Sequence, residues 1–303
     1  MAVIANIQLI NKETVKVFTA SLAWVIYLFF LPYVYASINI FSIFFIIFPG
    51  VYILCLLAQF VHECWHEYLP RIDNEFFYLI LSWMIFIDPQ TFEIVHPSHH
   101  TQVNTYNDME FHPLGEIKNK LLRIIYNFSE ICLGKMFVFI VADFQILKNQ
   151  KLKQQYYFKK LIISIWMRIF IWGGIGYTSH VLLGVTTSQI IISYLIICWM
   201  GSFIVHHCEL IEHGNLIIEG NLKERNLKTR NLKPSGILER FFLFITHNHC
   251  LEHSLHHSLS NIYTRPFPQI NALPDETVYI SFSEYLVILK DMLTGKCPIT
   301  NIE

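Results

Sequence analysis

Histidine residues recur in this chain at the short intervals that place side chains on one face of a helix. Three clusters read HECWH at 62–66, HPSHH at 96–100 and HSLHH at 253–257, and another histidine stands in IEHGNL at position 213. Residues i, i+3 and i+4 of a helix point in similar directions, and neutral imidazole binds iron, zinc and copper. The number of ligands predicts a metal centre that holds more than one ion.

The composition indicates that a membrane surrounds these clusters. Hydrophobic residues make up 53% of the chain, charged residues only 15%, and the mean hydropathy is +0.42. Such values are typical of integral membrane proteins. The net charge of −1 gives no electrostatic support for nucleic-acid binding, and none of the 7 cysteines forms a CxxC pair that would indicate a cysteine-bound metal.

Four apolar stretches approach the ~20 residues that cross a bilayer. They lie at about 15–37, 38–61, 161–178 and 185–205. The apolar segment 76–87 is short for a span, so we expect a re-entrant or interfacial helix there. Charges interrupt the segment 121–147, which favours an interfacial amphipathic helix. A six-span arrangement, in which both segments cross, is the alternative.

Lysines flank the predicted spans at the ends that would face the cytoplasm. Lys12 and Lys16 lie at the start of the first span, and a cluster of lysines at 148–160 precedes the third. The excess of positive charge predicts that both termini and the parts 62–160 and 206–303 are cytoplasmic. We therefore expect residues 1–303 to form a single all-α integral membrane domain: about four transmembrane helices, interfacial helices and a cytoplasmic helical cap that carries the metal centre.

The first cluster alone supports a rival interpretation. HECWH also fits the HExxH pattern, in which His62 and His66 would bind zinc and Glu63 would be the general base of a membrane protease. Such a protease needs one zinc ion with three protein ligands. It has no use for the histidines of the two later clusters.

Taken together, the clusters, their intervals and the spans resemble those of the membrane fatty acid desaturase and hydroxylase superfamily of histidine-box, non-haem di-iron enzymes. The resemblance extends from about residue 15 to 268. It implies nine iron ligands: His62, His66, His96, His99, His100, His213, His253, His256 and His257. Six further residues are expected to support these ligands: Glu63, Asp108, Glu110, Glu252, His207 and His249.

Glu209 is the predicted catalytic carboxylate. It lies four residues before His213, where the superfamily tends to place an asparagine near the metal. If the segment is helical, Glu209 and His213 share a face, so the carboxylate could approach one iron.

The motifs point to two reaction outcomes. HPSHH, followed by TQVNTYNDME, resembles the desaturases, whereas IEHGNL and HSLHH resemble the hydroxylases. The second cluster and its acidic tail favour an oxygen-dependent desaturase of acyl chains in lipid metabolism. A hydroxylase of alkanes or fatty acids, or a decarboxylase that makes terminal alkenes, is the alternative within the superfamily.

The resemblance also implies the cofactors and partners. These are two iron ions, dioxygen as a co-substrate, a fatty acyl or alkyl substrate in the membrane, and in one version an acyl carrier protein. The chain contains no dinucleotide fingerprint and no CxxC pair, so we expect a separate ferredoxin, rubredoxin or cytochrome-type electron donor. The repeat NLKERNLKTRNLKP at 221–234 is either a solvated loop or a basic surface that docks an acidic partner or anionic lipid.

Overall fold

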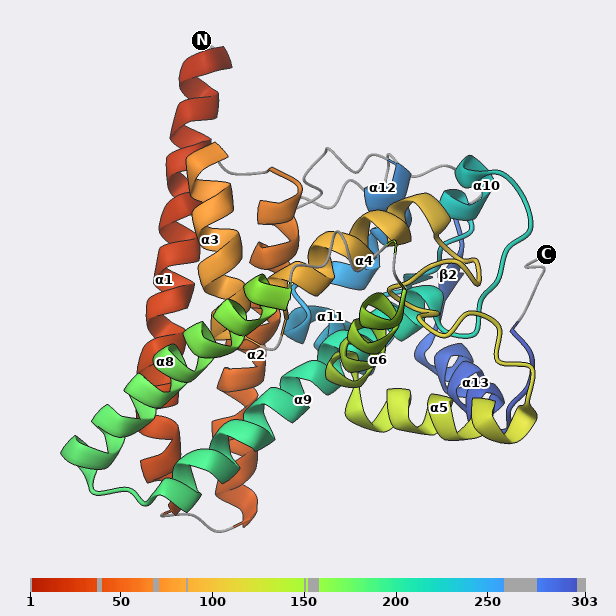
Figure 1. The fold of residues 1–303 in the computed structure, drawn as a ribbon. Helices are drawn as coiled ribbons and strands as arrows, with labels where there is room; N and C mark the ends of the chain where they lie inside the picture. Colours follow the sequence, from red (N-terminus) through yellow and green to blue (C-terminus); the bar gives the residue numbers. More distant parts are fainter. Residues whose placement is uncertain are drawn as a thin grey trace. The chain divides into compact units, whose positions relative to one another are not determined.

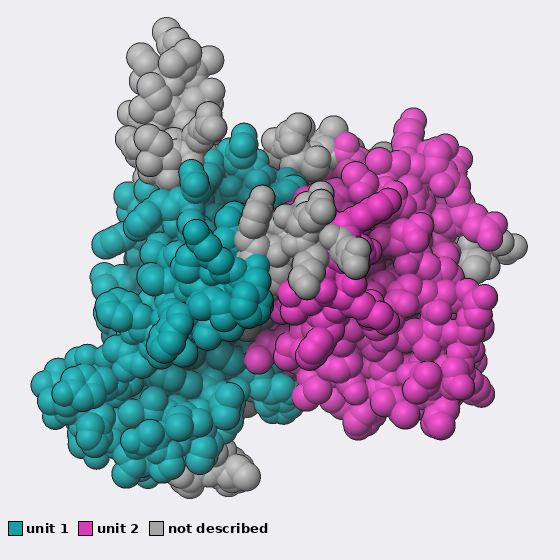
Figure 2. Space-filling model, in the orientation of Figure 1, with its two compact units in different colours: residues 1–89, 158–201 teal, residues 90–157, 202–303 magenta. Residues whose placement is uncertain are grey.

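The computed structural model describes residues 2–36, 40–67, 71–85, 87–149, 151, 158–258 and 277–298. Side chains are described from residue 14 onwards, except within 40–45 and 71–73. The chain divides into two compact units, residues 1–89 with 158–201 and residues 90–157 with 202–303 (Figure 2). The boundaries fall at the starts of two helices and inside a third. The single domain over 1–303 stays a prediction.

The first unit consists of long apolar helices (Figure 1). These are α1 (Ala2–Ala36), α2 (Ile40–Trp65), α3 (Arg71–Met84), α8 (Phe158–Leu183) and the first part of α9 (Thr187–His213). Among the described residues, four helical stretches are long and apolar enough to cross a membrane, namely Thr14–Ala36, Ile46–Trp65, Phe158–Leu183 and Thr187–His213. The predicted all-α class with four span-length helices is therefore confirmed.

Helix α3 has 14 residues, and so do α5 (Lys120–Leu133) and α6 (Lys135–Lys148). At 1.5 Å per residue each is about 21 Å long, which is shorter than the ~30 Å hydrocarbon core. The lengths of these helices therefore favour four spans over six. The connection at 37–39 and Lys153, used in the topology prediction, lie outside the described residues.

Several polar side chains inside the first unit contact backbone carbonyls or opposite charges, which lowers the cost of placing them in hydrocarbon. The indole Nε1 of Trp24 donates to the Met84 carbonyl at 2.8 Å, which ties α1 to α3. Arg168 of α8 donates to the Ile87 carbonyl at 2.5 Å and lies 3.6 Å from the Asp88 carboxylate. This pairing compensates for a charge within a span-length helix.

The second unit is built from shorter helices. It contains α4 (Pro89–Gln102) from residue 90 on, α5, α6, the end of α9, α10 (Leu222–Leu227), α11 (Ile237–Ile245), the 3-10 turn η1 (His249–Leu251), α12 (His253–Ser258) and α13 (Phe282–Leu293). Two short strands, β1 (Asn231–Leu232) and β2 (Tyr279–Ile280), pair in parallel. Helix α13 lies beside α5 (Figure 1), and its Tyr285, Ile288 and Met292 are buried in the core of the unit.

The segment 121–147 forms two helices, and the expectation of one helix is wrong. Gly134 separates α5 from α6 with a φ of 69°, which disfavours residues that carry a Cβ. A Cβ at this position would lie 2.5 Å from the Ser202 carbonyl oxygen of α9, so only glycine allows this close approach. Helix α5 buries Glu130 and exposes Phe128. Its contact with a membrane surface stays a prediction.

The basic repeat folds partly into α10 and β1, and its docking to an acidic partner or anionic lipid stays a prediction. Asn221 and Glu224 form a capping box at the start of α10, and the side chains of Asn226 and Arg230 are buried. The guanidinium of Arg230 donates to the carbonyls of Glu212 and Gly214 at the end of α9. The repeat therefore satisfies the last carbonyls of that helix, which would otherwise lack partners.

Candidate metal centre

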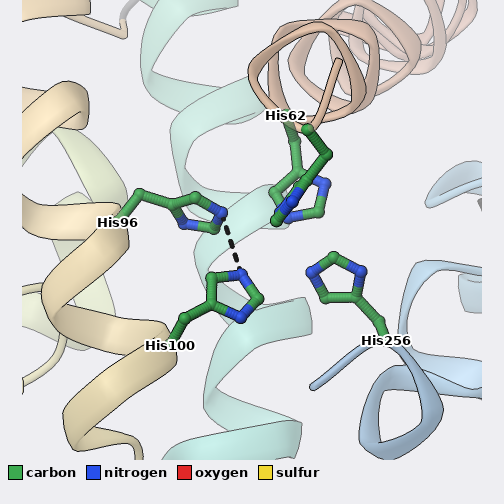
Figure 3. A group of neighbouring side chains, drawn as sticks. His62, His96, His100 and His256 are labelled. Atoms are coloured by element: carbon green, nitrogen blue, oxygen red, sulfur yellow. Dashed lines mark hydrogen bonds between the residues drawn. The ribbon is translucent and has the colours of Figure 1, made fainter. Parts of the chain in front are cut away.

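Helix α4 presents three histidines on two neighbouring faces. His96 and His100 are one turn apart, and their Nε2 atoms are 3.2 Å from each other (Figure 3). His99 points in a different direction because adjacent helical residues are rotated by about 100°. The cluster HPSHH is therefore divided between two groups of ligands, which are described next.

His96 and His100 meet His256 of α12 in a first cluster, named group A here. The side chains point toward one another (Figure 3), and the nearest nitrogen atoms of the three residues all lie within 4.8 Å of one another. The rings of His100 and His256 have centroids 5.0 Å apart. His96 is stacked on Phe92 at a centroid distance of 4.4 Å, which fixes its ring plane.

His99 belongs to a second cluster of four buried histidines, named group B, with His213, His253 and His257. Their Nε2 atoms form a chain of three contacts. The distances are 3.1 Å from His99 to His257, 3.0 Å from His257 to His253 and 3.0 Å from His253 to His213. These residues come from α4, the end of α9 and α12.

Hydrogen bonds at the opposite ring nitrogens fix the tautomers of the two outer members. Nδ1 of His99 donates to the Asp108 carboxylate at 2.8 Å, and Nδ1 of His213 donates to Oδ1 of Asn104 at 3.0 Å. The Asn104 amide is oriented because its Nδ2 donates to the Arg225 carbonyl and to Thr229 Oγ1. Neutral His99 and His213 therefore direct Nε2 lone pairs into group B.

Hydrogen bonds between neutral rings cannot satisfy every contact of group B. If His257 and His253 donate to the outer lone pairs, two N–H groups face each other in the middle contact. With neutral rings, any other arrangement of protons leaves at least one outer contact with two facing lone pairs. A metal cation accepts all four lone pairs. Ligand nitrogens about 2.1 Å from one ion and at right angles are about 3.0 Å apart, which agrees with the observed spacing.

The electrostatic environment keeps His253 and His257 in the neutral form that binds metal. Burial, reinforced by neighbouring histidines, holds the pKa values of His253 and His257 well below the usual range, so both rings are neutral. Burial also acts to lower the pKa of His99, but the Asp108 carboxylate outweighs burial, and the pKa is raised. The all-nitrogen donor set of the two groups fits a divalent iron or zinc ion.

His62 and His66 lie in the first unit, at the end of α2. Their ring centroids are 4.7 Å apart, and Nδ1 of His62 is 3.2 Å from the Glu63 carboxylate. The backbone N–H of His66 donates to the His62 carbonyl at 3.2 Å, which continues the helical turn beyond Trp65. The pair thus has the spacing of a two-histidine ligand set.

The predicted supporting carboxylates Asp108 and Glu110 contact one histidine each. Glu110 accepts from Nδ1 of His96 at 3.0 Å, as Asp108 does from His99. Burial acts to raise the pKa of Glu110, but the Lys135 ammonium and His96 hold the pKa well below its usual range. Glu110 is therefore an anion next to a candidate ligand.

Glu209 shares the helix α9 with His213, as expected, but its carboxylate has other contacts. One oxygen accepts from Lys135 Nζ at 2.8 Å, and the other lies 3.1 Å from His206 Nδ1. Glu212 instead lies beside group B, with an oxygen 3.4 Å from Nε2 of His253. Its carboxylate, His249 and His253 bring three ligand atoms within 4.8 Å of one another.

The remaining predicted supporting residues have different surroundings. His207 hydrogen-bonds to the Tyr285 hydroxyl at 2.5 Å and to the Ile131 carbonyl at 3.1 Å, within the core. His249 is in contact with His253, with ring centroids 5.1 Å apart. Glu252 is buried directly before α12.

Four residues that the sequence did not single out as supporting residues make contacts here: Asn104, Glu130, Lys135 and Glu212. The charges at 130 and 135 were visible only as interruptions of an amphipathic pattern. Glu212 precedes His213 directly, so the i, i+4 rule selected Glu209 instead. Asn104 contacts His213 across 109 residues, and no short-range spacing signals such a pair.

A cavity of about 50 Å³ reaches the edge of group B. Its lining includes Phe111, His112, Glu130 and His213. A water molecule needs about 10–15 Å³ of such space, so the cavity has room for a few water-sized molecules. Small polar or diatomic molecules therefore have space beside one candidate ligand.

The long apolar helices and the clustered histidines together define a membrane protein of the histidine-box class. Residues 39–279 match the model of the fatty acid desaturase family, so the chain belongs to this family, within the membrane desaturase and hydroxylase superfamily. A comparison with curated proteins found no match, and a comparison with solved structures found none. The family implies an oxidoreductase of the oxygen-dependent desaturase or hydroxylase type.

Proposed function

We propose that this protein is an oxygen-dependent di-iron desaturase of fatty acyl chains. The observation that carries the proposal is group B, whose four histidines converge through Nε2 atoms 3.0–3.1 Å apart, as the ligands of one cation would. The overall reaction would take a CH2–CH2 unit, dioxygen, two electrons and two protons to a CH=CH unit and two waters. The bound metal would supply the activation of dioxygen.

The chain would hold two ions through nine histidines. His99, His213, His253 and His257 of group B would bind one ion. His96, His100 and His256 of group A would bind the other, together with His62 and His66 of α2. Because nine neutral imidazoles carry no charge, anions near the ligands must offset the charge of the ions. Asp108, Glu110 and Glu212 are placed to do so.

The protein's own residues would orient the ligands and exclude water. Asp108 and Asn104 fix the rings of His99 and His213, so these ligands are in place before a metal binds. Phe111 packs against His99 and His213, with centroid distances of 4.9 Å and 4.5 Å, and covers one side of these two rings. Electrons would come from a separate donor protein, and we expect the site to face the cytoplasm.

A hydroxylase is the second candidate, because the IEHGNL segment has a structural role at the site. His213 is a member of group B, and the Glu212 carboxylate lies beside His253 of the same group. Gly214 directly follows, and a Cβ there would lie 2.5 Å from the Leu210 carbonyl oxygen, so the tight end of α9 requires glycine. A zinc protease based on His62, Glu63 and His66 would give no role to the four histidines of group B.

Two measurements test the proposal. Metal analysis of the protein purified in detergent should find about two irons per chain, whereas one zinc per chain would support the protease. Lipid profiling by mass spectrometry, in a host that expresses the protein, should find a new double bond in acyl chains. An oxygen-bearing product would support the hydroxylase.

H257A should abolish product formation. The matched control is H180A, because His180, near the end of α8, hydrogen-bonds to the Val185 carbonyl at 2.6 Å and belongs to neither histidine group.

A further inference from the structure

Lys135 is a buried cation in the interior of the second unit. It is the first residue of α6 and is 2% exposed. Its Nζ donates to Glu110 Oε1 and to Glu209 Oε1, both at 2.8 Å. The rings of Phe111 and Phe139 lie 5.0 Å and 5.1 Å from the ammonium. Burying such a charge is costly unless it is paired, and Lys135 is paired twice.

One of these pairs leads directly to group A. Glu110 uses Oε1 for Lys135 and Oε2 for Nδ1 of His96. A single carboxylate therefore connects the ammonium to a candidate ligand. Since Nδ1 of His96 donates to Glu110, Nε2 of His96 carries the lone pair and faces His100.

The other pair leads away from the histidine groups. Glu209 Oε2 lies 3.1 Å from Nδ1 of His206, and Nε2 of His206 lies 3.2 Å from Glu130 Oε1. Three carboxylates, Glu110, Glu209 and Glu130, thus surround Lys135 and His206, so negative charge remains in excess even when His206 is protonated. Such an excess complements a dication held by neutral imidazoles.

A buried ion pair is weak evidence for stability, because apolar residues of similar volume often stabilise a protein as well or better. A role at the metal centre explains why the charges are kept. We propose that Lys135 is a positioning residue for group A: it fixes the Glu110 carboxylate, which in turn directs the Nε2 atom of His96 toward the metal. The inference rests on the proposed metal centre and adds a residue to it.

The test compares K135M with K135R in the full-length protein loaded with ⁵⁷Fe in detergent. Competition with a chelator measures the affinity of each iron, and Mössbauer spectroscopy separates the two irons. K135M should weaken one of the two irons by about 10- to 100-fold, the usual effect of losing a partner behind a ligand. The doublet of that iron should shift and should be the one that H256A removes. K135R should restore most of the affinity.

The second iron acts as an internal control, since group B would be lost along with group A if K135M only disturbed folding. Should K135M not fold, the double variant E110Q/K135M removes the uncompensated carboxylate as well. It should fold and should show the same selective weakening. E209Q leaves the contact between Lys135 and Glu110 in place, so it should affect group A less than K135M does.

Two results would overturn the inference. In the first, wild-type protein holds two irons and K135M, or the double variant, holds both with unchanged affinity and spectrum. In the second, both irons weaken equally and K135R does not restore them, which would assign Lys135 a structural role. Wild-type protein that binds fewer than two irons would contradict the proposed function itself, and the role of Lys135 with it.

Discussion

The Asp108 carboxylate lies 2.8 Å from Nδ1 of His99, and Nε2 of the same ring lies 3.1 Å from Nε2 of His257. Nδ1 of the imidazole thus faces an anion, and Nε2 faces the centre of group B. Asp108 also accepts the backbone N–H of Glu110 at 3.0 Å, so its own position is fixed. The orientation of this ligand is therefore built into the protein.

We expect D108N to weaken iron binding in group B by about 10- to 100-fold. An amide can turn its NH2 group toward His99 and oppose the required tautomer. Chelator competition on the purified protein measures the effect. D291N is the matched control, because Asp291 pairs with the exposed Lys296 far from any histidine group in the sequence. Equal iron affinity in D108N and wild type would contradict the orienting role.

His256 and His257 are adjacent in the sequence but should bind different ions. His256 belongs to group A and His257 to group B. H256A and H257A should therefore each remove one iron per chain, and a different one. Metal analysis gives the number and Mössbauer spectra give the identity. Spectra in which both variants lose the same iron would show that the assignment of the groups is wrong.

Asn104 both orients the candidate ligand His213 and stabilises the fold. N104D keeps an oxygen for His213 but loses the two bonds donated by Nδ2 to the Arg225 carbonyl and Thr229. We expect N104D to retain most of its iron and to lower the free energy of unfolding by about 1–3 kcal/mol. N104A should lose affinity in group B as well. Thermal melts and metal analysis on the same samples distinguish these effects.

Gly134 should be among the least replaceable glycines. G134A combines a φ of 69° with a Cβ 2.5 Å from the Ser202 carbonyl oxygen. We expect destabilisation by about 1–3 kcal/mol, measured by thermal unfolding in detergent. In G173A of α8 the new Cβ meets no atom of the described residues within 4 Å, so this variant should melt at or above the wild-type temperature. Similar melting temperatures for the two variants would refute the argument.

Removal of the metal should destabilise the second unit. Without a cation, one contact in the chain of Nε2 atoms in group B lacks an attractive interaction. A ligand that binds only the folded state stabilises it by mass action. Treatment with a chelator should therefore lower the melting temperature, and Fe²⁺ should restore it. Unchanged melting after complete removal of iron would show that the histidines do not depend on an ion.

Local patterns were sufficient for the spans and for the histidine clusters. Hydrophobic length located four helices of span length, and the i, i+3 and i+4 spacings located histidines that the fold brings together in group B. The same reasoning failed at Gly134, because the break depends on the approach of Ser202, which is distant in the sequence. It also selected Glu209, because helical periodicity cannot reveal that Lys135 holds the carboxylate.

The division of adjacent histidines between groups A and B has a geometric consequence. Both α4 and α12 supply ligands to both groups, so the separation of the two groups is fixed by helix pitch, about 1.5 Å of rise and 100° of rotation per residue. A rigid displacement of either helix would change both coordination spheres at once. A one-residue insertion between His99 and His100 would therefore change the spacing between the two candidate metal positions.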